Sequence, residues 1–328
     1  MRKDFGRVMI TSSMYSLIIY ILTSTKREIE DTFFFFTEKI PSEIGARLKN
    51  VHYFSAKKHE SGGRFMSRFM IRIEALYRWT FLKRAKIYGS DYLFFVSPLI
   101  KKRDMIVIEE GTVNYSREVL LQHKRKSRFK KVLYGPRINE PMFGASRLDK
   151  KVILTGLGPI PEEIKEKVEL VNLRELWLQI SDDYRDWVLQ LFGLDHSKLE
   201  ILKSRRAILL IQAFEKLGVE EDVVVETYRQ IVKNVDPKDL VIKPHPSSTI
   251  DYSKIFPEAY IFADKIPMEL LSFIGTDFKD AYTVCSTAVF SMGKETNIHF
   301  AGSSVHPQIE EAIGSVEYSD FTHKTGLS

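Results

Sequence analysis

In three short stretches, a run of apolar residues is followed by side chains that could bind a charged ligand or transfer a proton. The first is VIEEGTVNY (107–115), where two consecutive carboxylates, Glu109 and Glu110, precede a glycine. In α/β folds the carboxyl ends of the strands face the ligand crevice. Side chains alternate along a strand, so at most one carboxylate faces a ligand while the other caps backbone or pairs with a cation. An ordinary acidic turn explains the pattern equally well.

The second stretch is LVIKPHPSS (240–248), which holds a histidine between two prolines. Each proline restricts the backbone and lacks an amide donor, a costly way to place a histidine unless its position matters. His245 as an imidazolium, together with Lys243, would bind a phosphate and stabilise the charge that develops as it departs. Ser247 and Ser248 are candidate helix N-caps. The structural alternative is a histidine satisfied within a turn.

The third stretch is VCSTAVFSM (284–292), in which Ser286 and Thr287 end a predicted strand and begin a predicted helix. A helix N-terminus with hydroxyl donors suits a phosphate, although most such pairs are plain N-caps. Between the second and third stretches lies KIPMELL (265–271), whose Glu269 falls in the first turn of a predicted helix. An acid is favourable for the helix there, and it is also placed to accept a ribose hydroxyl.

The sequence gives no sign of a metal site. It has no Cys/His cluster, and SDD (181–183) falls in polar helix or loop rather than at a strand end. No Gly-rich phosphate loop of the Walker or dinucleotide type follows a strand. We therefore expect no cofactor, and a monophosphate donor neutralised by protein groups rather than a diphosphate donor that requires Mg²⁺.

The elements that must position these residues form two series of alternating strands and helices, which predict mainly parallel α/β sheets. The first series has predicted strands at 7–11, 31–37, 50–55, 91–97, 105–110 and 151–156, and a helix at 161–172. After a basic helical connector, the second has predicted strands at 207–212, 239–244, 259–264, 281–286 and 297–302, and helices at 220–234, 267–274 and from 287. We expect two Rossmann-like domains, 1–200 and 201–328, facing a central cleft in the GT-B architecture of glycosyltransferases.

Composition limits the partners. The chain has 328 residues and a net charge of +6, which favours nucleic acid, an anionic membrane surface or an anionic substrate. Its basic residues are scattered along the sequence with no interleaved aromatic platform, which disfavours nucleic acid. The single cysteine, Cys285, excludes an intramolecular disulfide and fits the cytoplasm.

Two hydrophobic stretches are candidates for membrane contact. VMITSSMYSLIIYIL (8–22) is too short to span a bilayer and lacks a cleavage pattern, so we expect a strand that runs into a buried helix. The stretch 64–89 has the period of an amphipathic helix with one basic side. It would bury its apolar side in the core or in a homodimer, or else lie on an anionic bilayer.

The ordered set of EEG, His-Pro and Ser-Thr resembles the motifs of bacterial sialyltransferases. It is most similar to glycosyltransferase family 52, the lipooligosaccharide and capsule sialyltransferases. EEGTVN resembles that family's acidic-acidic-Gly-Thr-x-Asn run, and STAVFSM with NIHFAG resembles its Ser-rich turn and the strand after it. In outline the likeness extends from the first strand to about residue 307. It implies a GT-B fold, CMP-sialic acid as donor and inversion at the anomeric carbon.

The resemblance also implies a role for individual residues. His245 would contact the CMP phosphate and act as general acid to the leaving group. Ser286 and Thr287 would bind the same phosphate, and Glu269 would hold the ribose. The remaining residues expected in the nucleotide site are Lys243, Pro244, Pro246, Ser247, and Phe262 and Ala263 beside the cytosine.

Two regions of the sequence are candidates for the general base. Related sialyltransferase families use an acid of the acidic pair, here Glu109 or Glu110. Characterised family 52 enzymes use an acid in the loop after the second domain's first strand. That loop is IQAFEKLG (211–218), and its acid is Glu215, although the family's Asp is replaced by Glu and the expected preceding Pro is missing.

The resemblance therefore implies a metal-independent, inverting sialyltransferase. It would transfer sialic acid from CMP-Neu5Ac to the terminal galactose of a lipooligosaccharide or capsule glycan, with α2,3 as the family's usual linkage and a homodimer as a reasonable assembly. A polysialyltransferase and a CDP-polyol-phosphate transferase are alternatives with the same fold. A non-catalytic basic binding protein fits least well.

Overall fold

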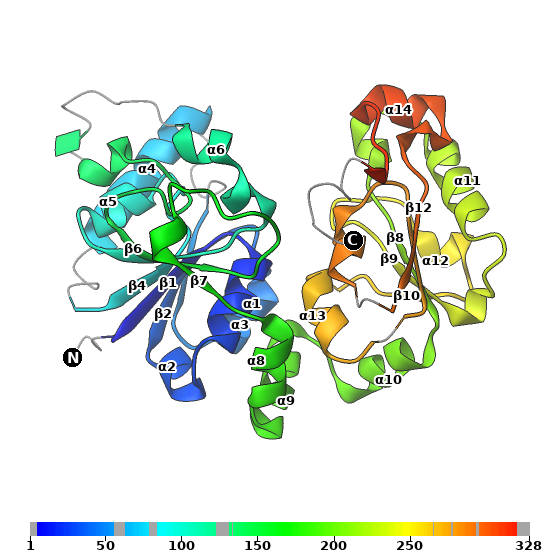
Figure 1. The fold of residues 1–328 in the computed structure, drawn as a ribbon, viewed down its shortest axis with the longest axis horizontal. Helices are drawn as coiled ribbons and strands as arrows, with labels where there is room; N and C mark the ends of the chain where they lie inside the picture. The colour runs from blue at the N-terminus through cyan, green and yellow to red at the C-terminus, as the bar shows by residue number, and fades with distance from the viewer. Residues whose placement is uncertain are drawn as a thin grey trace. The chain divides into compact units, whose positions relative to one another are not determined.

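The chain divides into two units, Met1–Leu191 and Phe192–Ser328, each with its own parallel sheet (Figure 1). The division falls at the end of helix α9 (Asp182–Phe192), whereas the boundary expected at residue 200 lies inside α10 (His196–Ser204). The structure is a computed structural model that describes residues 5–55, 63–78, 84–122, 131–132, 134–264, 266–276, 278–292 and 295–319.

Seven parallel strands form the sheet among the described residues of the first unit, in the order β3-β2-β1-β4-β5-β6-β7. They are β1 (Arg7–Thr11), β2 (Thr32–Thr37), β3 (Val51–Phe54), β4 (Lys86–Gly89), β5 (Met105–Ile108), β6 (Asp149–Leu154) and β7 (Val168–Leu170). The chain moves outward from β1 through β2 and β3, and then continues from β4 on the other side of β1. The order therefore reverses between β1 and β4, and at such a switch point the carboxyl ends of the strands leave a crevice for a ligand.

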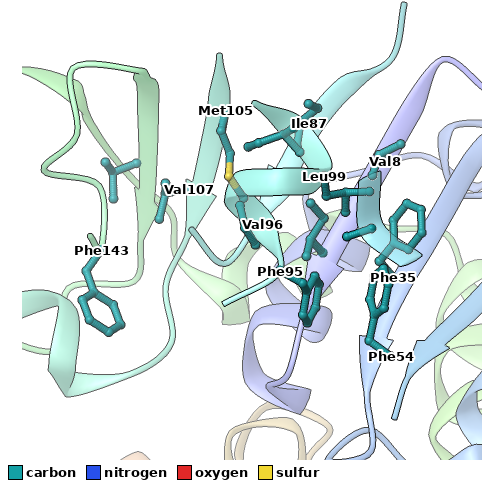
Figure 2. Close-up of a cluster of buried hydrophobic side chains, with 14 of the residues drawn as sticks. Val8, Phe35, Phe54, Ile87, Phe95, Val96, Leu99, Met105, Val107 and Phe143 are labelled. Atoms are coloured by element: carbon teal, nitrogen blue, oxygen red, sulfur yellow. The ribbon is translucent and has the colours of Figure 1, made fainter. Parts of the chain in front are cut away.

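Helices cover both faces of this sheet, and their bounds are α1 (Met14–Leu22), α2 (Lys26–Glu30), α3 (Ser42–Arg47), α4 (Gly63–Arg78), α5 (Val96–Ile100), α6 (Arg117–Leu121) and α8 (Leu173–Gln179). On one face, side chains of α4, α5 and α6 share one buried cluster with strand residues. Figure 2 shows Val96 and Leu99 of α5 in this cluster together with Val8 and Phe35. On the other face, Tyr20 of α1 contacts the ring of Phe34 edge-on at 6.2 Å. Because both faces are buried, β2 reads as a continuous aromatic run rather than an alternating one.

The second unit has a parallel sheet in the order β10-β9-β8-β11-β12 within its described part. Its strands are β8 (Ala207–Leu210), β9 (Leu240–Lys243), β10 (Tyr260–Ile261), β11 (Asp280–Thr283) and β12 (Asn297–Phe300). Its helices, besides α10, are α11 (Glu221–Ile231), α12 (Tyr252–Ile255), α13 (Met268–Phe273) and α14 (Pro307–Ile313). The switch point here lies between β8 and β11. The expected α/β class, with a parallel sheet in each unit, is confirmed.

Four predicted elements differ from the structure. The apolar run 91–97 is a turn followed by α5, because a short apolar run does not distinguish a strand from a buried helix. The strand of this region is β4, which lies in the stretch predicted as helix 64–89. The predicted helix 161–172 holds a 3₁₀ turn (Lys165–Lys167) and edge strand β7, where pairing with β6 outweighs helix propensity. The helix expected from residue 287 is a 3₁₀ helix, η8 (Thr287–Ser291).

The two hydrophobic stretches, 8–22 and 64–89, differ in how much of their apolar surface is buried. As predicted, residues 8–22 form a strand and then α1, which is buried along almost its whole length. Helix α4 buries Ile71 and Ala75 in the core and exposes Met66, Met70 and Tyr77, and residues 79–83 lie outside the described part. Among the helices that the structure describes, none has the length and apolar composition needed to cross a membrane. Homodimerisation and membrane contact remain predictions.

Candidate active site

Side chains that follow three neighbouring strands meet at the switch point of the first unit. Ser12 follows β1, Ser90 follows β4, and Glu110 follows β5 after one intervening residue. Gly89 allows this convergence, because it has φ +114° and a Cβ there would lie 1.9 Å from the carbonyl oxygen of Ile10. Only glycine fits so close to β1, and it places Ser90 at the carboxyl edge of the sheet.

The two adjacent carboxylates point to different surroundings, as the alternation along a strand predicts. Glu109 is fully buried, and its Oε2 accepts hydrogen bonds from the backbone N–H of Thr155, from Thr155 Oγ1 at 2.9 Å and from Tyr115 Oη at 3.0 Å. It therefore ties the end of β5 to the end of β6. Its neighbourhood also raises the pKa of Tyr115, first through burial and then through the Glu109 charge.

Glu110 is held by hydroxyl groups. Ser90 Oγ donates to Oε1, and Tyr92 Oη donates to Oε2 at 3.3 Å. Tyr92 Oη also lies 2.7 Å from Ser12 Oγ, so Ser12 supplies the proton of that bond when Tyr92 donates to the carboxylate. Burial raises the pKa of the Glu110 carboxyl, while hydrogen bonds from Ser90, Ser16 and Tyr92 partly oppose the rise. Glu110 is thus a more basic carboxylate than an exposed one.

A second layer of buried groups fixes Tyr92. Its ring stacks on Phe143 with centroids 4.9 Å apart, and Phe143 has a left-handed backbone with φ 59°. Asp91 holds this strained loop by accepting from the backbone N–H groups of Phe143 at 2.8 Å and Gly144 at 2.9 Å. Burial and the nearby Asp149 raise the pKa of Asp91 to about 7.

The loop after β9 carries the histidine of the second unit. His245 is exposed between Pro244 and Pro246, and its Nδ1 accepts the backbone N–H of Ser247 at 3.2 Å and lies 2.7 Å from Ser247 Oγ. An amide N–H only donates, so the neutral ring carries its proton on Nε2 and presents an N–H outward. Neither Ser247 nor Ser248 is an N-cap as expected, because the next helix, α12, is capped by Asp251.

Lys243 ends β9 and turns toward β10. Its Nζ donates to the carbonyl oxygen of Asp264 at 2.9 Å and lies 4.9 Å from the ring centroid of buried Phe262. The Asp264 carboxylate pairs with Lys198 of α10 at 2.9 Å. Ala263, between Phe262 and Asp264, is exposed. A cation therefore directly precedes the histidine loop, bonded to the segment after β10 that contains the exposed Ala263.

Glu215 lies in the 3₁₀ turn after β8 and contacts the same loop. Its Oε1 accepts the backbone N–H of Thr249 at 3.0 Å, and its Oε2 is buried without a hydrogen-bond partner among the described residues. The carboxylate therefore anchors the far end of the segment that carries His245.

The loop after β11 brings Ser286 and Thr287 to the switch point of the second unit. Thr283 links the end of β8 to the loop after β11. Its Oγ1 donates to the carbonyl oxygen of Leu210 at 3.0 Å and accepts the Ser286 N–H at 3.0 Å. The Ser286 side chain makes no capping bond to η8, and Thr287 is exposed. Glu269 is the second residue of α13, and its side chain lies outside the described part.

The structure adds residues that the motifs did not single out, namely Ser12, Ser90, Tyr92, Asp91 and Thr155. Ser90 and Tyr92 flank one acid in GSDY (89–92), directly before the run that was predicted as a strand. A correctly placed β4 would have put this segment at a strand end beside the EEG motif. Within the described residues, no three His, Cys, Asp or Glu side chains gather as they would around a metal ion.

Two parallel α/β units, each with polar strand-end residues at its switch point, are the parts of the GT-B fold. A sialyltransferase from Photobacterium damselae, described as its GT-B domain, matches with TM-score 0.56 at 12% identity, covering 90% of each chain. A 2,6-sialyltransferase from Photobacterium sp. JT-ISH-224 matches with TM-score 0.60 at 12% identity, covering 90% of this chain and 71% of that one.

The sequence comparisons assign the family. The family model of glycosyltransferase family 52 matches residues 3–309, so the chain belongs to that family and is a glycosyltransferase. An uncharacterised protein of Haemophilus influenzae is 31% identical over 318 residues, which cover 95% of this chain and 99% of that protein. The resemblance seen in the EEG, His-Pro and Ser-Thr motifs is thereby confirmed at the level of the family.

Proposed function

We propose that the protein is an inverting sialyltransferase that transfers sialic acid from CMP-Neu5Ac to the terminal galactose of a cell-surface glycan. The observation that carries the proposal is the Glu110 carboxylate, which is held by hydroxyls at a switch point and raised in pKa by burial, in a family 52 chain. The crystal structure of the Photobacterium 2,6-sialyltransferase, with CMP and lactose, supports the same donor and acceptor classes.

In the proposed reaction, Glu110 accepts the proton of the acceptor hydroxyl. The hydroxyl oxygen then forms a bond to the anomeric carbon on the face opposite the nucleotide. The bond from that carbon to the phosphate oxygen breaks, and CMP leaves with the electron pair. No covalent enzyme intermediate is needed, and the configuration at the anomeric carbon is inverted.

Of the three carboxylates considered as base, Glu110 is the best suited. Glu109 already accepts three hydrogen bonds and lies completely inside the fold. Glu215 is committed through one oxygen to the backbone of the histidine loop. We assign Glu215 to positioning that loop, and Glu110 to proton abstraction.

His245 acts on the leaving group as a hydrogen-bond donor. Since Nδ1 accepts the Ser247 N–H, the Nε2–H of the neutral ring is available to a phosphate oxygen. The departing CMP phosphate is a stable anion, so a donated hydrogen bond is sufficient to stabilise it. Lys243 at the end of β9, and Ser286 and Thr287 after β11, supply further donors. Pro244 and Pro246 restrict the loop's backbone.

The test of the base compares Glu110→Gln, Glu109→Gln and Glu215→Gln by transfer from CMP-Neu5Ac to lactose. We expect Glu110→Gln to lose roughly 10²–10⁴-fold in kcat, the usual contribution of a positioned base. Glu215→Gln keeps an amide oxygen for the Thr249 N–H and should lose less than tenfold. Near-normal turnover by Glu110→Gln would disprove its role, and a large loss in Glu215→Gln alone would transfer that role to Glu215.

The test of the leaving-group donor compares His245→Gln with His245→Ala. The glutamine amide places an N–H near the position of Nε2 but cannot transfer a proton. Removing one donor from a developing anion typically costs about 10²–10³-fold, which we expect for alanine. Glutamine should restore at least part of that loss. Equal losses in both variants would instead support proton transfer by His245.

A further inference from the structure

A basic cavity of about 610 Å³ opens at the amino ends of β4, β5 and β6 in the first unit. Arg84 lies just before β4, Lys86 is its first residue, and Lys102 and Arg103 come from the turn before β5. Lys150 is the second residue of β6. Because these strands are parallel, their amino ends meet at the edge of the sheet opposite to Glu110. The cavity is therefore not part of the site described above.

The charges around this cavity are strongly unbalanced. Among the described residues, five cationic side chains line it with one carboxylate, Asp104, which lies 3.7 Å from Lys150. Its apolar lining consists of side chains anchored in the fold, of which Ala85, Ile87 and Met105 are almost completely buried. A concave site with this lining suits a multiply charged anion, with the apolar surface beside it.

Arg103 shows that the cavity is built into the fold. Its Nη2 donates to the carbonyl oxygen of Ala85, and its own carbonyl accepts from Nη2 of Arg137 at 3.1 Å. Arg137 is in turn locked by a buried ion pair with Asp149 at 2.6 Å. The backbone of Arg103 is thus held by the core.

The guanidinium of Arg103 lacks a full set of acceptors. Its Nη1 is buried, and no described residue accepts a hydrogen bond from it. Burial lowers the pKa of Arg103, which means that its surroundings disfavour the charge. Keeping this partly buried guanidinium charged destabilises the fold, and a negative charge in the cavity that Arg103 lines offsets that cost.

We propose that this cavity binds a phosphate group that carries more than one negative charge. Arginine and lysine together recognise phosphate through bidentate and point-charge contacts, and the cavity supplies both residue types. β4 and β5 are four residues long, so about 13 Å of strand separates this site from Glu110. The ligand chemistry is shared by phospholipid headgroups and soluble phosphate compounds.

The experiment uses the full chain with saturating CMP, which occupies the proposed donor site. In one arm, pyrophosphate is titrated and binding is followed by calorimetry. In the other, co-sedimentation is measured with phosphatidylcholine vesicles that contain or lack phosphatidic acid. The test variant is Lys86→Glu/Lys102→Glu, whose two side chains are exposed. The control is Lys203→Glu/Lys233→Glu, with the same change of charge on exposed helical and turn positions of the second unit.

We expect the test variant to lose at least roughly tenfold in affinity, and the control variant to bind as the original protein does. Pyrophosphate binding would assign a soluble phosphate, and binding only to vesicles with phosphatidic acid would assign a lipid headgroup. The proposal is overturned if the original protein binds neither probe. It is equally overturned if both double variants weaken binding to the same extent.

Discussion

Replacing Tyr92 with phenylalanine removes one hydrogen bond to the Glu110 carboxylate and keeps the ring that stacks on Phe143. The Tyr92 hydroxyl stabilises the ionised carboxylate, so its loss raises the pKa of Glu110 further above the ordinary value. Since the proposed base must be ionised, the acidic limb of kcat/KM against pH should move to higher pH. The rate on the plateau above that limb should change little.

The size of the shift follows from the contact. A hydrogen bond to a charged group contributes about 1.5–3 kcal/mol, and one pKa unit corresponds to about 1.36 kcal/mol. The Tyr92 Oη to Glu110 Oε2 distance of 3.3 Å is long for a bond to a carboxylate, so we use the lower end of that range. The acidic limb should then rise by roughly one pH unit, and kcat/KM well below the limb should fall roughly tenfold.

The assay is kcat/KM for transfer from CMP-Neu5Ac to lactose across the acidic and neutral pH range. The matched control is Tyr20→Phe, which removes a buried hydroxyl bonded to Thr32 Oγ1 at 2.6 Å in the same unit. Ser90→Ala should shift the limb at least as far as Tyr92→Phe, because the Ser90 hydrogen bond opposes the raised pKa of Glu110 more than the Tyr92 bond does. An unmoved limb in Tyr92→Phe, or an equal shift in Tyr20→Phe, would refute this reasoning.

Three further predictions concern stability and reactivity. Arg137→Met leaves a buried carboxylate unpaired and should lower the free energy of unfolding by about 3–5 kcal/mol in urea titrations, whereas Arg147→Met, at an exposed ion pair, should change it by less than about 1 kcal/mol. Gly89→Ala should cost roughly 1–3 kcal/mol more than Gly111→Ala, because both glycines have positive φ but only the first lacks room for a Cβ; equal losses would contradict the clash. Burial raises the pKa of Cys285 to about 11, so the native thiol should react with an aromatic disulfide reagent at pH 8 far more slowly than the urea-unfolded one, and equal rates would contradict its burial.

The sequence predicted most of the fold because both sheets are buried on both faces. Strands such as β2 and β8 then appear as continuous apolar runs between polar turns. The errors fall where the local signal is weak. β4 has four residues and ends in glycine, and β7 is an edge strand of three residues whose existence depends on pairing with β6. Neither has a pattern that local sequence alone separates from helix or loop.

The motifs of the site could be predicted from the sequence, but the hydrogen bonds that hold their side chains could not. EEG, KPHP and ST each follow a strand in the structure, as their apolar flanks indicate. The sequence could not separate Glu110 from Glu109, because the difference depends on Thr155 and Tyr115 for one carboxylate and on hydroxyls after other strands for the other. These contacts arise from sheet order, which has no local signature.

The sheet order of the first unit also has a consequence for folding. Strand β1 pairs with β4, and the Ser12–Tyr92 hydrogen bond joins residues 80 positions apart. Contacts between distant positions form only after a long loop has closed, which slows folding. The hydroxyls that hold Glu110 therefore come together late, after β1, β4 and β5 have paired. Substitutions confined to this cluster should accelerate unfolding and leave the rate of folding almost unchanged.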